Sequence, residues 1–182
     1  MPLSKKNLFI SRLSLLVALA MVIQIIGLPQ PVTGPLINLI LFITATSLNW
    51  MAGCLLGSLT PLMALIRGQI PTVLGILVPF IATANVILVS VYCLFHLFLT
   101  RFSRLSSSLT LAIAIILAAI SKYLFFVITL KFILPLIFHY RIPEPIAFIF
   151  MTPQLVTALI GGALFYFLMT ILSKSGYLIH RD

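Results

Sequence analysis

One lysine, Lys122, lies inside an apolar segment where a charged side chain is energetically unfavourable. Lys122 is near the middle of an apolar, helix-length run from Leu109 to Pro135. The chain has eleven Lys and Arg residues and only two acids, Glu144 and Asp182, both outside the apolar runs. An unpaired ammonium at membrane depth costs about 2.5–3.5 kcal/mol on insertion scales. Lys122 is therefore expected to face a ligand, or else backbone carbonyls and buried water.

Helical spacing indicates which side chains could share a pocket with Lys122. Phe126 and Thr129 follow it on one stripe, whereas Lys131 is turned about 180° away and should extend to the membrane interface. Asn85 is expected at mid-membrane in the apolar segment before the one that holds Lys122, and Thr157 is expected in the outer half of the last apolar segment. For Asn85 and Thr157 a structural role stays open, because such residues often only bond a neighbouring helix.

The composition predicts an all-α integral membrane protein that forms a single domain over residues 1–182. The chain is 62% hydrophobic and 7% charged, whereas soluble domains average about 25% charged residues. Its basic residues stand at the ends of apolar runs instead of forming a stripe, so a nucleic-acid partner is not expected. Cys54 and Cys93 lie inside apolar runs without a partner at metal-ligand spacing, and neither a metal nor a cofactor is expected.

Proline, glycine and polar breaks divide the chain into six expected spans. A rigid, non-helical loop is expected at Pro29–Pro35, a break between two short helices at Ser47–Trp50, and a kink in the fourth helix at Pro79. The expected spans are Phe9–Leu28, two helices within Leu36–Ile66, Thr72–Leu99, Leu109–Leu134 and Thr152–Leu172.

The basic residues favour six spans with both termini in the cytoplasm, since cytoplasmic loops carry an excess of Lys and Arg. Six spans put Lys5, Lys6, Arg12, Arg101, Arg104, Lys174 and Arg181 on one side, and Arg67 and Arg141 on the other. Five spans would leave almost no bias. The expected location is the cell membrane, most simply a prokaryotic plasma membrane, and the first helix is expected to be retained.

This topology puts three Pro/Gly-rich loops, around Gln30, Gln69 and Pro143, on the outer side. Such loops could cover a ligand pocket or simply reverse the chain. Lys122, with Arg67 and Arg141 at the outer mouth, would favour a carboxylate, a phosphate or an electron-rich ring. Phe126 and Tyr92 could stack on a heterocycle.

Small residues at helical spacing predict close helix contacts. Gly53 and Gly57 form a G-x-x-x-G pair, Ser14 and Ala18 repeat the spacing on the first helix, and Gly161 opens a small-residue patch on the last. Most such patches pack within a bundle. The patch on the first helix could instead face a partner subunit.

The order of these features resembles the substrate-binding S components of energy-coupling factor (ECF) transporters. The features are the Ser14/Ala18 helix, the loop Leu28-Pro29-Gln30-Pro31-Val32-Thr33-Gly34-Pro35-Leu36, the Gly53/Gly57 helix running into Thr60-Pro61, and the segment Pro153-Gln154-Leu155-Val156-Thr157-Ala158-Leu159-Ile160-Gly161-Gly162. The resemblance covers essentially the whole chain, and its strongest element is the Pro-Val-Thr-Gly-Pro loop.

The resemblance implies a six-helix subunit that captures a vitamin or cofactor precursor outside the cell and has no enzymatic activity. Its implied partners are a membrane coupling subunit, met by Ser14 and Ala18, and two ATPase subunits. The lid would be Gln30 to Gly34. Together with the residues that share a pocket by helical spacing, the substrate-binding candidates are Gln30, Thr33, Arg67, Gln69, Asn85, Lys122, Phe126, Gln154 and Thr157. Cobalamin lower-ligand precursors, folates, lipoate-like acids and pantothenate stay open, and cationic thiamine is disfavoured.

The sequence agrees that energy for transport would come from a partner. It has no G-x-x-x-x-G-K-[ST] phosphate loop and no chain of intramembrane acids. Competing interpretations are a solitary carrier or channel, a membrane enzyme, or a non-catalytic membrane subunit of another complex. An enzyme would need paired acid and base groups, and a redox subunit would need facing His or Cys ligands. Neither arrangement is visible in the sequence.

Overall fold

The structure, a computed structural model, describes residues 4–175, and this part of the chain is helical without any strand. His180 and Arg181, which the sequence assigns to a basic tail, lie outside the described residues. The elements in order are α1 (Lys5–Ile26), α2 (Gln30–Ser47), α3 (Trp50–Ile66), the 3-10 helix η1 (Thr72–Leu77), α4 (Val78–Phe102), α5 (Ser107–Ile128), the π-helical segment η2 (Thr129–Ile133), α6 (Leu134–Ile137) and α7 (Glu144–Lys174).

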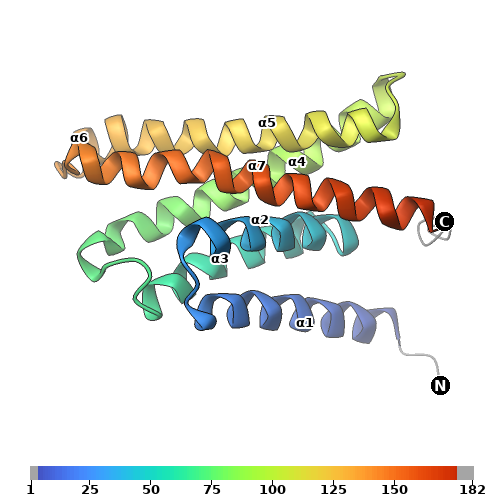
Figure 1. The fold of residues 1–182 in the computed structure, drawn as a ribbon, viewed down its shortest axis with the longest axis horizontal. Helices are drawn as coiled ribbons and strands as arrows, with labels where there is room; N and C mark the ends of the chain where they lie inside the picture. Colours follow the sequence, from blue (N-terminus) through green and yellow to red (C-terminus); the bar gives the residue numbers. More distant parts are fainter. Residues whose placement is uncertain (1–3, 176–182) are drawn as a thin grey trace.

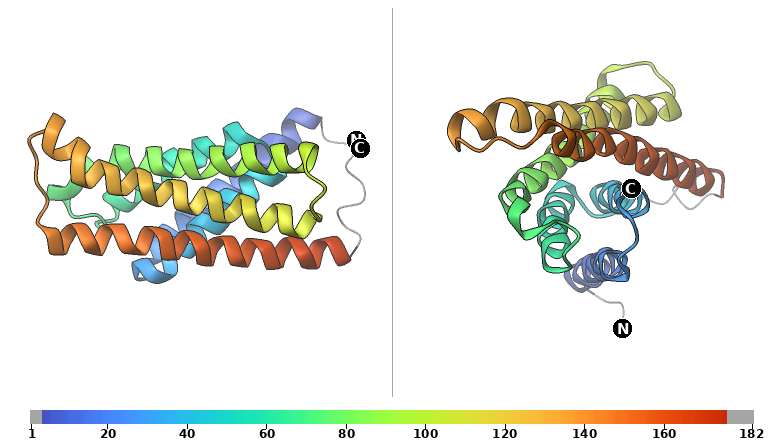
Figure 2. Two further views of the ribbon diagram at one scale, coloured as in Figure 1. Left: turned by 90° about the horizontal axis from the view of Figure 1, so that it is seen from above. Right: turned by 60° about the vertical axis from the view of Figure 1, so that its left-hand side comes forward.

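The helices form one bundle in which sequence neighbours run in alternating directions (Figure 1). The long helix α5 packs against both α4 and α7, α2 lies against α7, and α3 lies against α4. Helix α1 lies at the edge of the bundle and packs on α2 and α3 (Figure 2). The start of α1 and the end of α7 lie at one end, and the α1–α2, α3–α4 and α6–α7 connections gather at the other.

Four helices in the described part of the chain are long and apolar enough to cross a membrane. They are Lys5–Ile26, Thr72–Phe102, Ser107–Ile137 and Ile146–Lys174. Helix α3 is also apolar but has only 17 residues. The prediction of an all-α protein with membrane-spanning helices is confirmed in this respect, for the described residues.

The prediction of a break at Ser47–Trp50 is also confirmed, because α2 ends at Ser47 and α3 begins at Trp50. Asn49 between them has an extended backbone, and its side-chain oxygen accepts from the Ala52 amide at 2.8 Å. An Asn in this position caps one of the unpaired N–H groups at a helix start. The local polar residues therefore end one helix and begin the next.

The prediction of a non-helical loop at Pro29–Pro35 is wrong, because α2 begins at Gln30. Pro29 is the extended residue that precedes the helix, and Pro31 occupies its first turn, where a missing N–H costs nothing. Only Pro35 lies far enough into the helix to remove a backbone hydrogen bond. Gln30 and Thr33 are consequently fixed on a helix and do not form a lid loop.

Two further helix boundaries predicted from prolines are wrong. Pro79 lies where the 3-10 helix η1 passes into α4, so the helical geometry of the span from Thr72 changes beside this proline. Helix α7 begins at Glu144, ahead of the predicted start at Thr152, and continues through Pro153. The α5 segment does not stop at Pro135 but passes through η2 into α6. Proline is tolerated in a first turn and, in membrane helices, inside a helix whose neighbours stabilise it.

The predicted small-residue contacts lie inside the bundle. Gly53 and Gly57 are buried where α3 meets α4, and Gly161 is buried where α7 crosses α2. A Cβ on Gly161 would lie 2.5 Å from the Pro35 carbonyl oxygen and 2.8 Å from the Asn38 Cβ. The α2–α7 crossing therefore requires glycine at this position, and it fixes where Asn38 stands.

Candidate functional site

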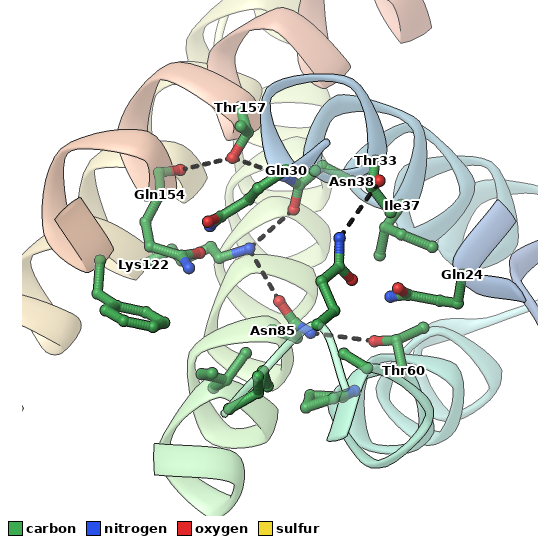
Figure 3. A pocket seen from close by; sticks show the side chains of 17 residues that line it. Gln24, Gln30, Thr33, Ile37, Asn38, Thr60, Asn85, Lys122, Gln154 and Thr157 are labelled. Carbon is green, nitrogen blue, oxygen red and sulfur yellow. Dashed lines mark hydrogen bonds between the residues drawn. The ribbon is translucent and has the colours of Figure 1, made fainter. Parts of the chain in front are cut away.

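A polar cavity of about 100 Å³ lies toward the end of the bundle that holds the α1–α2, α3–α4 and α6–α7 connections (Figure 3). Every long helix contributes to its lining. The lining residues are Gln24, Gln30, Thr33, Gly34, Ile37, Asn38, Thr60, Pro61, Ala64, Gln69, Ile70, Ile81, Asn85, Lys122, Phe150, Gln154 and Thr157. On a scale where about 10–15 Å³ holds one water, this volume admits several waters or a compact ligand.

Lys122 extends from α5 into this polar region and is only 3% exposed. Its Nζ donates to Asn38 Oδ1 and to Asn85 Oδ1, both at 2.8 Å. The acceptors are neutral amides, and the lining contributed by the described residues contains no Asp or Glu. Two charge-assisted hydrogen bonds offset part of the cost of burial, but they supply no counter-charge.

The two asparagines are themselves held by their amide nitrogens. Asn85 Nδ2 donates to the Gly57 carbonyl at 3.0 Å and to Thr60 Oγ1 at 3.2 Å. Asn38 Nδ2 is 3.5 Å from Thr157 Oγ1 on α7. Because the nitrogens are engaged elsewhere, the oxygens face Lys122. The resulting network joins α2, α3, α4, α5 and α7 around the cavity.

A second set of hydrogen bonds fixes the opposite wall. Thr33 Oγ1 donates to the Leu28 carbonyl at 2.7 Å, across the α1–α2 connection. Gln69, in the α3–α4 connection, has its Nε2 3.4 Å from both Thr33 Oγ1 and the Leu28 carbonyl. These bonds tie two connections to the first turn of α2, so this end of the cavity is built from fixed groups.

Gln24 differs from the other amides in this wall. It is the last polar residue of α1, it is 6% exposed, and its side chain reaches the cavity from the side opposite Lys122 (Figure 3). Its Oε1 is buried and has no hydrogen-bond partner. A buried acceptor left without a donor costs roughly 1–3 kcal/mol, so this group calls for a donor from the cavity.

Seven of the nine predicted substrate-binding residues line the cavity: Gln30, Thr33, Gln69, Asn85, Lys122, Gln154 and Thr157. The expected polar residues of five separate segments are thus brought together. Asn85 and Thr157 also make the interhelical hydrogen bonds that the alternative interpretation described. The two interpretations of these residues are therefore compatible.

Arg67 and Phe126 do not line the cavity. Arg67 is exposed, and its Nε donates to the Ile25 carbonyl at 2.9 Å, where it covers the C-terminal end of α1. Phe126 is fully buried in an apolar cluster with Leu77 and Leu134. Four residues on a helix amount to about 400°, and the remaining rotation turns Phe126 from the cavity into the core.

Tyr92, suggested by the sequence as a stacking residue, does not line the cavity either. Tyr92 lies two helical turns beyond Asn85, outside the cavity lining, and its hydroxyl is 2.8 Å from Thr46 Oγ1. Its ring packs against Phe42 and Phe165 in the main apolar core. Phe150 on α7 is the one aromatic residue in the described lining, so ring stacking is a minor part of this site.

Asn38, Gln24, Thr60 and Phe150 are lining residues that sequence reasoning missed. Asn38 and Gln24 had the same signal as Asn85, an amide within an apolar run. Such residues in membrane segments are expensive and therefore suggest an interior position. Thr60 and Phe150 had no comparable signal.

Ser14 and Ala18, the predicted partner contacts, are exposed on α1 and are remote from the cavity lining. Leu15 and Leu19 beside them are also exposed. Exposed apolar residues on a membrane helix contact lipid or another subunit, and the fold leaves this helix face open to either.

The chemistry available at the site is recognition of a polar molecule. One buried amine, six amide side chains and three hydroxyls surround the cavity, with no carboxylate among the described lining residues. Within residues 4–175, no group of three His, Cys, Asp or Glu side chains is arranged to hold a metal ion. No family model, curated protein or solved structure matches this chain.

Proposed function

We propose that this chain is the substrate-binding S component of an ECF-type importer, and that its cavity holds a vitamin or cofactor precursor with an anionic group. The observation that carries this function is Lys122, a buried amine with neutral protein acceptors at the wall of a polar cavity. An anionic ligand would supply the counter-charge that the described lining residues do not.

The position of the cavity supports capture from one side of the membrane. We propose six spans with both termini cytoplasmic, which would put the cavity in the outer half of the bilayer. The ends of α1, α4 and α7 that carry Lys5, Arg101 and Lys174 lie at the end away from the cavity (Figure 1). An excess of basic residues there agrees with the positive-inside rule. Helix α3, with 17 residues, would be a span of minimal length.

The expected energy source is a separate pair of ATPase subunits, joined to this chain through a membrane coupling subunit. The exposed face of α1 with Ser14 and Ala18 is the surface we propose for that contact. Small residues allow another helix to approach closely. The loose packing of α1, which touches mainly α2 and α3, leaves this face accessible.

The test is a binding screen on the purified chain in lipid nanodiscs. Vitamins and cofactor precursors would be screened by thermal shift and the hits measured by calorimetry, without ATP or metal. A ligand present at 100 times its Kd stabilises the folded state by about 2.7 kcal/mol, which is readily detected. One-to-one binding of an anionic micronutrient is expected. Absence of binding by any of them would refute the substrate-binding function.

The partner is tested separately by co-purification from the native membrane. An ATPase pair and a coupling protein should be recovered with the wild-type chain. Replacement of both Ser14 and Ala18 with Trp should abolish their recovery and leave ligand binding intact. Recovery of the ligand-binding chain alone would indicate a solitary carrier instead.

A further inference from the structure

The two ends of the cavity make different demands on a ligand. At one end, an ammonium offers three N–H donors, and Asn38 and Asn85 accept two of the three from Lys122. At the other end, Gln24 Oε1 is a buried acceptor without a donor. A single molecule that satisfied both ends would need an acceptor facing Lys122 and a donor facing Gln24.

The fixed network strengthens this asymmetry. Asn38 and Asn85 cannot turn their oxygens toward the cavity without losing the bonds of their amide nitrogens to Thr157 Oγ1 and to the Gly57 carbonyl. Gln24 has no such anchor for its oxygen. Among the described lining residues, the buried acceptor left without a donor is therefore contributed from α1, and the charged donor is contributed from α5.

Size restricts the ligand further. The cavity has a volume of about 100 Å³, below the roughly 300–1,000 Å³ of pockets for drug-sized ligands. Phe150 is the single aromatic residue among the described lining residues. A large fused aromatic cofactor would find neither the space nor the stacking surfaces that it requires.

We propose that the ligand of this cavity is a compact carboxylate whose opposite end carries an N–H donor, with the carboxylate on Lys122 and the N–H on Gln24 Oε1. This inference rests on the proposed function and narrows its substrate class. Lactam, cyclic urea and amide carboxylates have the required pair of groups. A carboxylate without a donor would leave Gln24 unpaired, at a cost of about 5-fold or more in affinity.

The test uses a library of small carboxylates in matched pairs, each with an N–H and with the same nitrogen methylated. Pyroglutamate and N-methylpyroglutamate form the smallest pair, and 2-pyrrolidinone is the matched lactam without the carboxylate. Binding would be measured by ligand-observed NMR on the full chain in nanodiscs. We expect the N–H member of the binding pairs to bind at least 5-fold more tightly, and 2-pyrrolidinone to bind more weakly than pyroglutamate.

A variant assigns the preference to Gln24. Gln24→Met keeps the length of the side chain and removes the acceptor, so the preference for N–H over N-methyl should disappear. Met21→Leu, one turn earlier on α1, is the matched control and should keep the preference. If Gln24→Met does not fold, the comparison of the paired compounds on the wild-type chain still decides the question.

The outcomes separate this inference from the proposed function. If carboxylates bind and Lys122→Met abolishes their binding, but methylation of the nitrogen has no effect, the substrate-class inference is wrong and the proposed function stands. Retention of the N–H preference by a folded Gln24→Met variant would also overturn the inference. If neither this library nor the micronutrient screen yields a ligand that depends on Lys122, both are wrong.

Discussion

The α2–α7 crossing makes Gly161→Ala the most sharply defined perturbation of the fold. The new Cβ would lie 2.5 Å from the Pro35 carbonyl oxygen and 2.8 Å from the Asn38 Cβ. Backbone cannot move aside as the end of a flexible side chain can, so the two helices must separate. Overpacking of this kind costs about 1–3 kcal/mol, and contact with backbone favours the upper part of that range. With about 2–4 °C per kcal/mol for a chain of this size, a cost of 2–3 kcal/mol lowers Tm by about 4–12 °C.

The assay is thermal unfolding of the detergent-solubilised protein, followed by circular dichroism. Gly75→Ala is the matched control, because a Cβ there would have its nearest neighbour, Leu65 Cδ1, at 3.8 Å, an ordinary contact. Its Tm should not fall. Equal Tm values for the wild type and Gly161→Ala would refute the close α2–α7 packing, and with it the position of Asn38 at the cavity.

The remaining predictions concern the polar network, a helix cap and the topology. Asn85→Leu should lower the free energy of unfolding by about 1–3 kcal/mol, because it leaves a donor of Lys122 unpaired. The same substitution should cost clearly less in a Lys122→Met background, where that donor is absent. Additive effects of the two substitutions in denaturant titrations would contradict the contact. Asn49→Ala should lower the free energy of unfolding by about 1 kcal/mol in the same titrations, whereas Asn49→Asp should keep the helix cap. Equal stability of the wild type and both variants would argue against the cap. In a chain without its native cysteines, a membrane-impermeant maleimide should label Arg141→Cys in intact cells and Arg104→Cys only after permeabilisation; the reverse pattern would invert the proposed topology.

The sequence was sufficient to predict the membrane class, the helix break before Trp50 and most of the polar residues that line the cavity. Polar residues in an apolar chain are few, and each is costly in a membrane. Lys122, Asn85, Gln154 and Thr157 could therefore be located by type and helical spacing alone, and the structure brings them to one cavity. Their convergence required the fold, since they come from three separate helices.

The errors have two physical causes. Proline was interpreted by its type, but its effect depends on its position, and Pro31 in a first turn begins α2 instead of preventing it. Phe126 was placed by an approximate helical stripe, although the direction in which a side chain points depends on which neighbour packs against it. Asn38 was overlooked although it has the same signal as Asn85, an amide within an apolar run; only the fold shows that it meets Lys122, 84 residues away.

The most direct test of the central claim is the affinity of Lys122→Met for the ligand that the micronutrient screen selects. Lys131→Met is the matched control, because Lys131 is exposed on the same continuous helical segment. Loss of a charge-assisted hydrogen bond of about 1.5–3 kcal/mol should weaken binding by about 10- to 150-fold in Lys122→Met. Lys131→Met should bind like the wild type. Wild-type affinity in a folded Lys122→Met variant would contradict the account.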